Sequence, residues 1–211
     1  MIIVLIGATG AGKSALTSFL LNNTRMERME KVTTRPRREN ETDGGDYSAF
    51  LKEENWNKTT ILFEETFDVK VEGEPVTWRY GYMPIAFDDV SSKIYLTDCH
   101  PLTAIKIQEY YGEDNVAIVN VSANYKVRLK RYMQRDSDMS DEDKKIEFAR
   151  RNGADLQYYT KGFLESINAV EIKNGVDGLD QWNYVCERAL NGLYGLIGMK
   201  ALHGGDARFE D

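Results

Sequence analysis

The sequence predicts an α/β protein in which helices cover both faces of a parallel sheet. Short apolar runs suited to buried strands alternate with longer segments whose apolar residues have helical spacing. Two stretches interrupt this alternation, a β-rich one at residues 35–82 and a polar one at residues 136–154. We therefore expect one three-layer domain over residues 1–211, with an insert and a lid. Its parts are expected to be a core of residues 1–34, 83–135 and 155–197, the insert 35–82, the lid 136–154 and a tail 198–211.

The composition fits a soluble globular domain. Of the 211 residues, 42% are hydrophobic and 29% are charged, and the net charge is −7. This acidic balance does not suggest a nucleic-acid partner. No apolar run approaches a membrane span, so no membrane partner is expected, and the apolar start is too short for a signal peptide. Two distant cysteines without metal-ligand spacing indicate a reducing compartment, so we expect a cytoplasmic protein, monomeric or homodimeric.

The first strand and the first helix enclose a glycine-rich segment. An apolar run at residues 2–6 is followed by Gly7-Ala8-Thr9-Gly10-Ala11-Gly12-Lys13-Ser14, which fits G-x-x-x-x-G-K-[ST] at every fixed position. Backbone N–H groups of such a loop surround a phosphate, and the helix start beneath it adds a positive dipole end. Lys13 is expected to reach the terminal phosphates, and the Ser14 hydroxyl to bind Mg²⁺. The predicted site for ATP and Mg²⁺ comprises Gly7, Gly10, Ala11, Gly12, Lys13, Ser14 and Ala15.

The predicted insert begins with an arginine-rich loop. A possible strand at residues 29–34 leads into a loop that contains three arginines within four residues, Arg35, Arg37 and Arg38. Pro36 excludes a helix there. Guanidinium groups so placed suit a second phosphate, and a solvated basic loop is the alternative. A short helix is expected over residues 48–58, and a β-hairpin over residues 59–80.

The α/β alternation resumes after the insert. A helix opened by Pro84 precedes a strand at residues 93–98, which ends in Asp98. Ligands lie at the carboxyl ends of parallel strands, so Asp98 is placed to face a site, with a helix N-cap as the alternative. A strand at residues 115–121 follows a helix at residues 101–111.

The helix expected next, over residues 125–135, carries Arg128, Arg131 and Arg135 on one face. Arg150 and Arg151 belong to a long helical stretch over residues 144–164, in which Gly153 is a possible break. A last strand at residues 168–172 and an amphipathic helix at residues 179–197 complete the core.

A phosphate loop, an insert with arginines and a lid with arginines meet the needs of a nucleoside monophosphate kinase. Both substrates are polyanions, so their charges must be neutralised as they approach in line. The lid must exclude water, because water would otherwise hydrolyse the donor.

These residues resemble guanylate kinase, a family of P-loop nucleoside monophosphate kinases. The resemblance rests on Thr33-Thr34-Arg35-Pro36-x-Arg38 and Asp43-Gly44-x-Asp46-Tyr47, which are far more specific than the phosphate loop. It extends to Tyr80-Gly81, to the helix with Arg131 and Arg135, and to Ile172-x-Asn174, and so spans nearly the whole chain. It implies a three-layer P-loop kinase fold and ATP-dependent phosphorylation of GMP or dGMP.

The resemblance also implies roles for single residues. Glu64 would read guanine N1–H and N2–H₂, with Glu65 as the alternative, and Asp98 matches an acidic position at the substrate. The acceptor's phosphate would be held by Arg35, Arg38, Tyr47 and Tyr80. The transferring phosphoryl group would be stabilised by Lys13, Arg131, Arg135 and either Arg150, our choice, or Arg151. Asn174 would belong to the ATP site.

Two residues depart from the family pattern. Lys31 stands where the family usually has a small hydroxyl residue, and Tyr82 stands where it has Ser or Thr. Both are base-reading positions, and Lys31 could donate to guanine O6 or N7. Another nucleoside monophosphate is therefore an alternative acceptor. A non-catalytic, partner-binding module is a further alternative, although such modules have a degraded phosphate loop and this loop is complete.

Overall fold

The fold is built around a five-stranded parallel sheet. The computed structural model describes residues 1–39, 41–71, 74–135, 139–175 and 179–204. The strand order is β2-β7-β1-β8-β9, and every pairing is parallel. The strands are β1 (Ile2–Ile6), β2 (Glu27–Arg28), β7 (Tyr95–Asp98), β8 (Val116–Ser122) and β9 (Val170–Lys173). The predicted parallel central sheet is confirmed.

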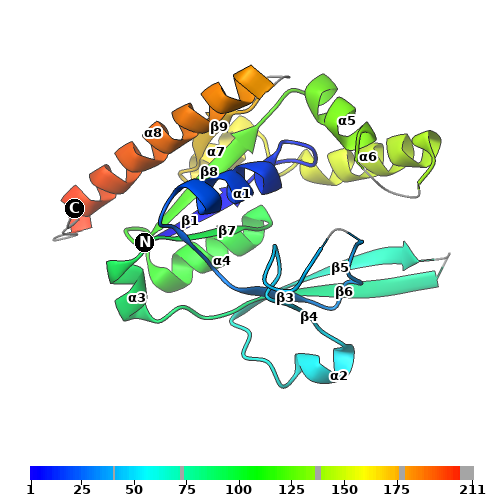
Figure 1. Cartoon of the computed structure of the whole chain (residues 1–211), viewed down its shortest axis with the longest axis horizontal. Coiled ribbons are helices and arrows are strands. Elements are labelled where there is room, and N and C mark those ends of the chain that lie inside the picture. The colour runs from blue at the N-terminus through cyan, green and yellow to red at the C-terminus, as the bar shows by residue number, and fades with distance from the viewer. Residues whose placement is uncertain (40, 72–73, 136–138, 176–178, 205–211) are drawn as a thin grey trace.

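Helices cover both faces of this sheet and give three layers (Figure 1). Side chains of β1 alternate between two cores: Ile3 and Leu5 face one helix layer, while Val4 and Ile6 face the other. The first layer consists of α1 (Lys13–Asn23) and α8 (Leu179–Gly204). The second consists of α3 (Phe87–Ser92), α4 (Pro101–Tyr111) and α7 (Lys161–Ser166). Both faces of β1 are therefore buried, which explains its continuous apolar sequence.

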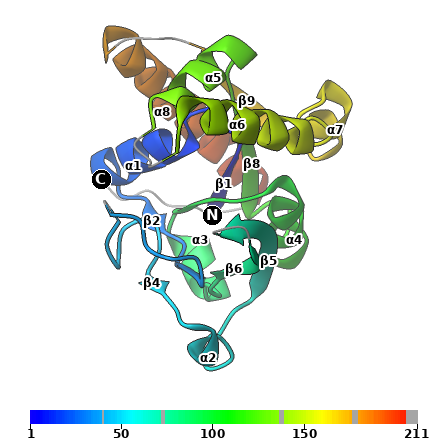
Figure 2. The ribbon, with the colours of Figure 1, turned by 90° about the vertical axis from the view of Figure 1, so that its right-hand side faces the viewer.

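A second sheet of four strands lies beside the core, on the side of the carboxyl ends of its strands (Figures 1 and 2). Its order is β4-β3-β6-β5. The strands are β3 (Lys31–Thr33), β4 (Ala49–Phe50), β5 (Phe63–Val71) and β6 (Glu74–Tyr82), and a short helix α2 (Glu53–Trp56) lies outside them. The antiparallel β5–β6 pair is the predicted hairpin.

Two local predictions in this region hold only in part. Of the strand expected over residues 29–34, residues 31–33 form β3, which pairs with β6 of the second sheet, whereas the core strand β2 lies before that range and pairs with β7. A chain that passes from one sheet to another keeps its β-type sequence throughout. The helix expected over residues 48–58 begins instead as β4, which hydrogen-bonds to β3 through Ser48 and Leu51.

Helices α5 (Tyr125–Met133) and α6 (Asp141–Asp155) project together above the second sheet (Figure 2). Phe148 of α6 is fully buried against the rings of Tyr125 and Tyr132, so the two helices pack as a pair. The helical stretch expected over residues 144–164 does break, two residues after the possible break at Gly153: α6 ends at Asp155, and α7 begins at Lys161.

Two predicted segments lie partly outside the described residues. Residues 136–138, at the start of the predicted lid, are among those not described, as are residues 205–211. The part of the predicted tail that is described, up to Gly204, continues α8. Among the described residues, none of the helices has both the length and the apolar content needed to cross a membrane.

Candidate functional site

The glycine-rich loop follows β1 and wraps the start of α1. Gly10 and Gly12 have φ values of 82° and 97°, which favour glycine. A Cβ on Gly10 would lie 2.5 Å from the Arg128 carbonyl oxygen, and one on Gly12 would lie 2.3 Å from Asn174 Nδ2. Glycine is thus required at both positions for conformation and for space.

Lys13 lies where the loop meets α1 and forms no ion pair with the carboxylates of the described residues. Its ammonium donates a hydrogen bond to the Gly7 carbonyl. Burial lowers the pKa of Lys13, and the more distant Asp98 opposes that effect only in part. A buried ammonium held by a single carbonyl favours an incoming anion.

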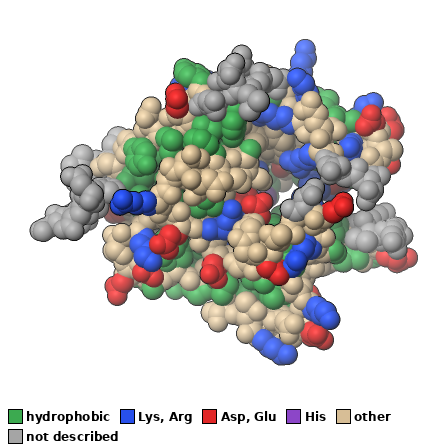
Figure 3. Space-filling view, viewed as in Figure 1, with side chains coloured by type: hydrophobic (Ala, Val, Ile, Leu, Met, Phe, Trp, Pro, Cys, Tyr) green, Lys and Arg blue, Asp and Glu red, His purple; other side chains and the backbone are tan. Residues whose placement is uncertain are grey.

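A cavity of about 360 Å³ opens over the loop. Besides loop residues from Thr9 to Ala15, its lining includes Arg131 of α5, Arg135 just after α5, and Arg151 of α6. Burial and the neighbouring Arg151 lower the pKa of Arg135, and none of the described carboxylates forms an ion pair with Arg135. Lys and Arg side chains gather beside the hollow between the core and the second sheet (Figure 3). This concentration of positive charge suits a ligand with several negative charges.

The structure distinguishes the two adjacent arginines of α6. Both guanidinium groups pair with Glu147 at 2.7 Å, but Arg151 lines the cavity, whereas 58% of the Arg150 side chain is exposed. Consecutive helical residues point about 100° apart, so only one of the two can face the loop. Our choice of Arg150 is therefore replaced by Arg151. The predicted cations Lys13, Arg131 and Arg135 are brought together.

Asn174 supports the loop from the other side. Its Nδ2 donates to the Ala11 carbonyl at 2.8 Å, and Arg131 donates to both oxygens of Asn174 at 3.0 and 3.2 Å. Asn174 is 1% exposed, so its side chain holds the backbone of the loop. The structure places Asn174 at the loop, and its role towards ATP stays a prediction.

The loop is also held by α6 and the turn that follows it. Thr9 is bound at both ends of its backbone, because its N–H donates to Asp155 at 2.7 Å and its carbonyl accepts from Arg128 at 3.0 Å. The Gly7 N–H donates to the Tyr159 hydroxyl at 3.1 Å. The other Nη of Arg128 donates to Asn152 of α6 at 2.6 Å. The phosphate loop and α6 are therefore joined directly.

A second cationic group lies on the second sheet and its adjoining loop. Arg35 is buried, its guanidinium binds both oxygens of Glu41 at 2.7 and 2.9 Å, and its guanidinium carbon is 5.4 Å from the centre of the Tyr47 ring. The rings of Tyr47 and Tyr80 are 6.0 Å apart. Burial, followed by the proximity of Tyr47, raises the pKa of Tyr80 to about 12. The predicted phosphate holders Arg35, Tyr47 and Tyr80 thus form one cluster.

Arg38 lies at the edge of this cluster. Its side chain is 64% exposed, and its backbone N–H donates to Glu41 at 2.9 Å. Its charge lowers the pKa of Tyr80 in the second group and that of Arg135 in the first, although burial is the largest influence on both. Arg38 therefore lies between the two cationic groups.

The third predicted group lies where β3 and β6 meet the end of β7. Lys31 Nζ is 2.6 Å from Asp98 Oδ1, and the Lys31 side chain is 6% exposed. Burial opposes charge on both partners, but their attraction outweighs it, so the pKa of Lys31 is raised and that of Asp98 is lowered. Tyr82 donates to Glu65 at 3.2 Å, and the His100 N–H donates to Glu65 at 3.0 Å. Glu65, Lys31, Tyr82 and Asp98 therefore converge.

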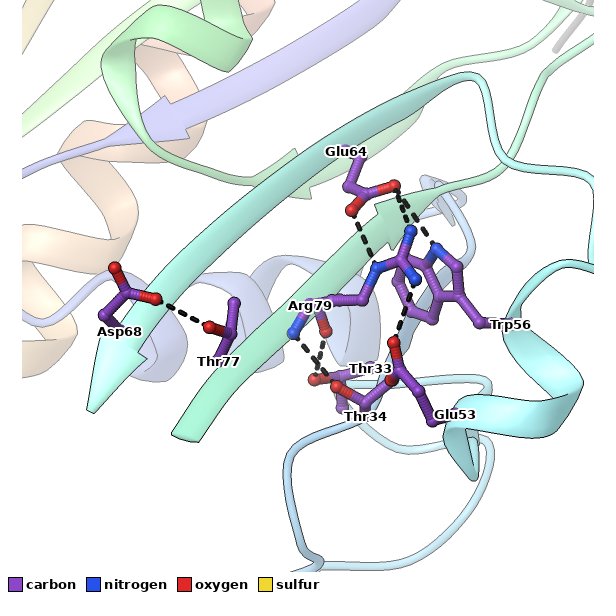
Figure 4. Close-up of polar contacts among 8 residues, drawn as sticks. All are labelled: Thr33, Thr34, Glu53, Trp56, Glu64, Asp68, Thr77 and Arg79. Atoms are coloured by element: carbon purple, nitrogen blue, oxygen red, sulfur yellow. Dashed lines mark hydrogen bonds and ion pairs between the residues drawn. The ribbon is translucent and has the colours of Figure 1, made fainter. Parts of the chain in front are cut away.

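Glu64 points to the opposite face of the hairpin (Figure 4). Its carboxylate accepts from Arg79 at 2.8 and 3.0 Å and from Trp56 at 3.2 Å. Arg79 also binds Glu53 of α2. Neighbouring residues of a strand point to opposite faces of the sheet, so Glu64 and Glu65 cannot both face the site. The structure thus does not support our choice of Glu64 and favours the alternative, Glu65.

The comparisons agree with this arrangement. Residues 1–62 match the family model described as guanylate kinase, and this segment includes the glycine-rich loop and Arg35. A crystal structure of guanylate kinase from Anaplasma phagocytophilum covers 92% of this chain and 85% of its own, with a TM-score of 0.57 and 16% identity.

The chain has the guanylate kinase fold. An unliganded crystal structure of a sugar kinase from Janibacter sp. HTCC2649 covers 91% of this chain and 93% of its own, with a TM-score of 0.43 and 13% identity. Comparison with curated proteins gave no match.

The residues at the loop fit a polyphosphate with Mg²⁺. The glycine cradle leaves backbone N–H groups free of any Cβ, and the Ser14 side chain lies at the first turn of α1 beside the cavity. The described residues contain no cluster of three His, Cys, Asp or Glu side chains that could hold a metal by themselves. Mg²⁺ needs few protein ligands when phosphate oxygens and waters complete its shell, so the Ser14 hydroxyl suits it.

Several residues of the site escaped sequence reasoning. Glu41 lies in a polar loop, and nothing in its surroundings distinguishes it from other exposed acids. Asp155 and Tyr159 act on the glycine-rich loop from about 150 residues away, which no local pattern reveals. Arg128 did give a signal, since it shares a helix face with Arg131.

Proposed function

We propose that this chain transfers the terminal phosphoryl group of ATP to a nucleoside monophosphate, with GMP or dGMP as the preferred acceptor. One observation carries the proposal: two separate cationic groups face each other, one over the glycine-rich loop and one around Arg35. The pKa of Tyr80, in the second group, is affected first by burial and also by Arg38 and by Arg151 of the first group. Closure of the lid would bring two phosphates held by these groups into line for reaction.

The proposed chemistry is an in-line displacement in which the protein positions charge. Lys13, Arg131, Arg135 and Arg151 would neutralise the donor and the transferring phosphoryl group, while the loop N–H groups hold the donor's phosphates. Mg²⁺, held at Ser14, would further neutralise the phosphate oxygens when bound. Arg35, Arg38, Tyr47 and Tyr80 would hold the acceptor's phosphate. The lid, with α6 as its described part, would close over them and exclude water.

The base preference rests on Glu65 and Lys31. Guanine presents N1–H beside O6, so Glu65 can accept from the first while Lys31 donates to the second. Adenine reverses both, because its N1 is an acceptor and its N6 a donor. A buried carboxylate facing adenine N1 would stay unpaired, which disfavours AMP. Lys31 and Tyr82 also make another oxo-base monophosphate the second candidate acceptor.

A coupled assay of ADP release tests this function. ATP and Mg²⁺ would be supplied with GMP, dGMP, AMP, CMP and UMP in turn, and we expect turnover with GMP and dGMP above all others. Lys13→Ala should lower the turnover rate by several orders of magnitude and leave the far-UV circular dichroism spectrum unchanged. Equal use of AMP would overturn the base assignment alone. No turnover with any acceptor would support the non-catalytic alternative.

A further inference from the structure

A second cavity, of about 220 Å³, lies behind the glycine-rich loop. Its floor is the sheet face that carries α4 and α7, and its roof comes from the end of α6 and the start of α7. Ala11 lines both this cavity and the donor cavity, but the lining here includes the acids Asp155 and Glu171, whereas the charged residues of the donor cavity are cations. The proposed reaction makes no use of it.

The floor contains an amide without a partner. Asn120 of β8 is 3% exposed, and its Oδ1 is buried and accepts no hydrogen bond among the described residues. Its strand neighbours Ile118 and Val116 belong to the apolar core of the same face. An unsatisfied amide in such surroundings costs about 1–3 kcal/mol, so a buried Asn at this place favours a ligand that donates.

The walls carry negative charge that the protein leaves unpaired. Asp155 accepts a hydrogen bond from the Thr9 N–H but forms no ion pair with the described residues. Glu171, which lies opposite Asn120 in the register of β8 and β9, also forms no ion pair with them. The cation of the lining, Arg128, already donates to the oxygens of Ala123, Thr9 and Asn152. The polar groups of the cavity that are still available therefore favour a ligand that donates hydrogen bonds and carries positive charge.

The walls between these polar groups are apolar. Leu156 and Leu164 line the cavity together with three alanines. A bare metal ion would leave these apolar walls and most of the volume unfilled, whereas an aliphatic chain would cover them.

We propose that this cavity is a second ligand site, which binds a small aliphatic ammonium ion. The ammonium group would donate to Asn120 and to the carboxylates of Asp155 and Glu171, and the alkyl chain would lie against Leu156 and Leu164.

Isothermal titration calorimetry with 1,4-diaminobutane tests the site on the full chain. We expect saturable binding with one diamine per chain, and none with 1,4-butanediol, which has the same length and no charge. Asn120→Leu and Glu171→Gln should each weaken diamine binding at least tenfold. The matched control is Glu109→Gln, an equal charge change on the exposed face of α4, which should bind as the wild type does.

Two results would overturn the proposal. Equal weakening by Glu109→Gln, or unchanged binding by Asn120→Leu and Glu171→Gln, would mean diffuse attraction of the diamine to an acidic protein. Absence of saturable binding would mean that water alone fills the cavity. A thermal melt keeps Asn120→Leu interpretable, because loss of the unsatisfied amide should raise the Tm of the ligand-free protein while the diamine-induced rise in Tm is lost.

Discussion

Single carboxylates decide the proposed base preference, and Glu64 and Glu65 provide a matched pair. Glu65→Gln should lower kcat/KM for GMP by about 100-fold, because the proposed acceptor for N1–H loses its charge. Glu64→Gln should leave kcat/KM within about twofold and lower the Tm, because Glu64 binds Arg79 and Trp56 instead. Steady-state kinetics and thermal melts of both variants measure this, and the reverse pattern would return the base-reading role to Glu64.

Arg150 and Arg151 form a second matched pair at the scale of one residue. Arg151→Ala should lower kcat by roughly 10²–10³-fold, since the cavity would lose a cation that faces the transferring group. Arg150→Ala removes an exposed pair with Glu147, so kcat should change by less than about threefold. Single-turnover rates at saturating substrates separate this effect from product release. Similar losses in both variants would indicate that α6 rotates in the reacting complex.

At the scale of elements, α6 both supplies Arg151 and holds the phosphate loop. Asp155→Ala should raise the KM for ATP about tenfold with little effect on the KM for GMP, because the Thr9 N–H loses its acceptor and the loop its fixed conformation. Asp155→Asn keeps an acceptor oxygen and should recover part of this loss. A fall in Tm without any change in the KM for ATP would reduce Asp155 to a purely structural role.

The molecule contains two sheets, and an ion pair connects them: Lys31 belongs to β3 of the second sheet and Asp98 to β7 of the central sheet. The pKa of Asp98 is lowered in the folded state, so its contribution to stability is present above its unfolded pKa and is lost as pH falls through the folded pKa. Lys31→Met should cost about 3 kcal/mol near pH 7, because Asp98 is left unpaired. This difference in the free energy of unfolding should shrink as Asp98 becomes protonated below about pH 4.

Denaturant melts of wild type and Lys31→Met between about pH 3 and pH 7 measure this difference. The control is the double variant Lys31→Met with Asp98→Asn, which removes both charges and should show a much smaller cost at neutral pH. A cost that does not vary with pH would mean that the lost packing of Lys31, and not its charge, joins the sheets.

The sequence predicted the features that are written locally. The glycine-rich motif lies between β1 and α1 as predicted, and β1, β7 and β8 form from the apolar runs that predicted them, so the parallel central sheet was confirmed. The choices that the geometry does not favour depended on a single step along an element. A shift of one residue moves a side chain across a strand, as with Glu64 and Glu65, or round a helix, as with Arg150 and Arg151. No local pattern fixes that step, since tertiary contacts such as the Arg79–Glu64 pair decide it.

The Glu41 carboxylate on Arg35 has a further consequence for the proposed acceptor. Glu41 already occupies the guanidinium of Arg35 and the backbone N–H of Arg38, so the protein carries an internal anion at the place where the acceptor's phosphate would bind. In the proposed function, acceptor binding would then be an ion exchange, in which the phosphate displaces a resident carboxylate. A free nucleoside cannot make that exchange, because it has no group to offer Arg35. Competition from the Glu41 side chain would thus let the protein exclude unphosphorylated nucleosides whatever their base.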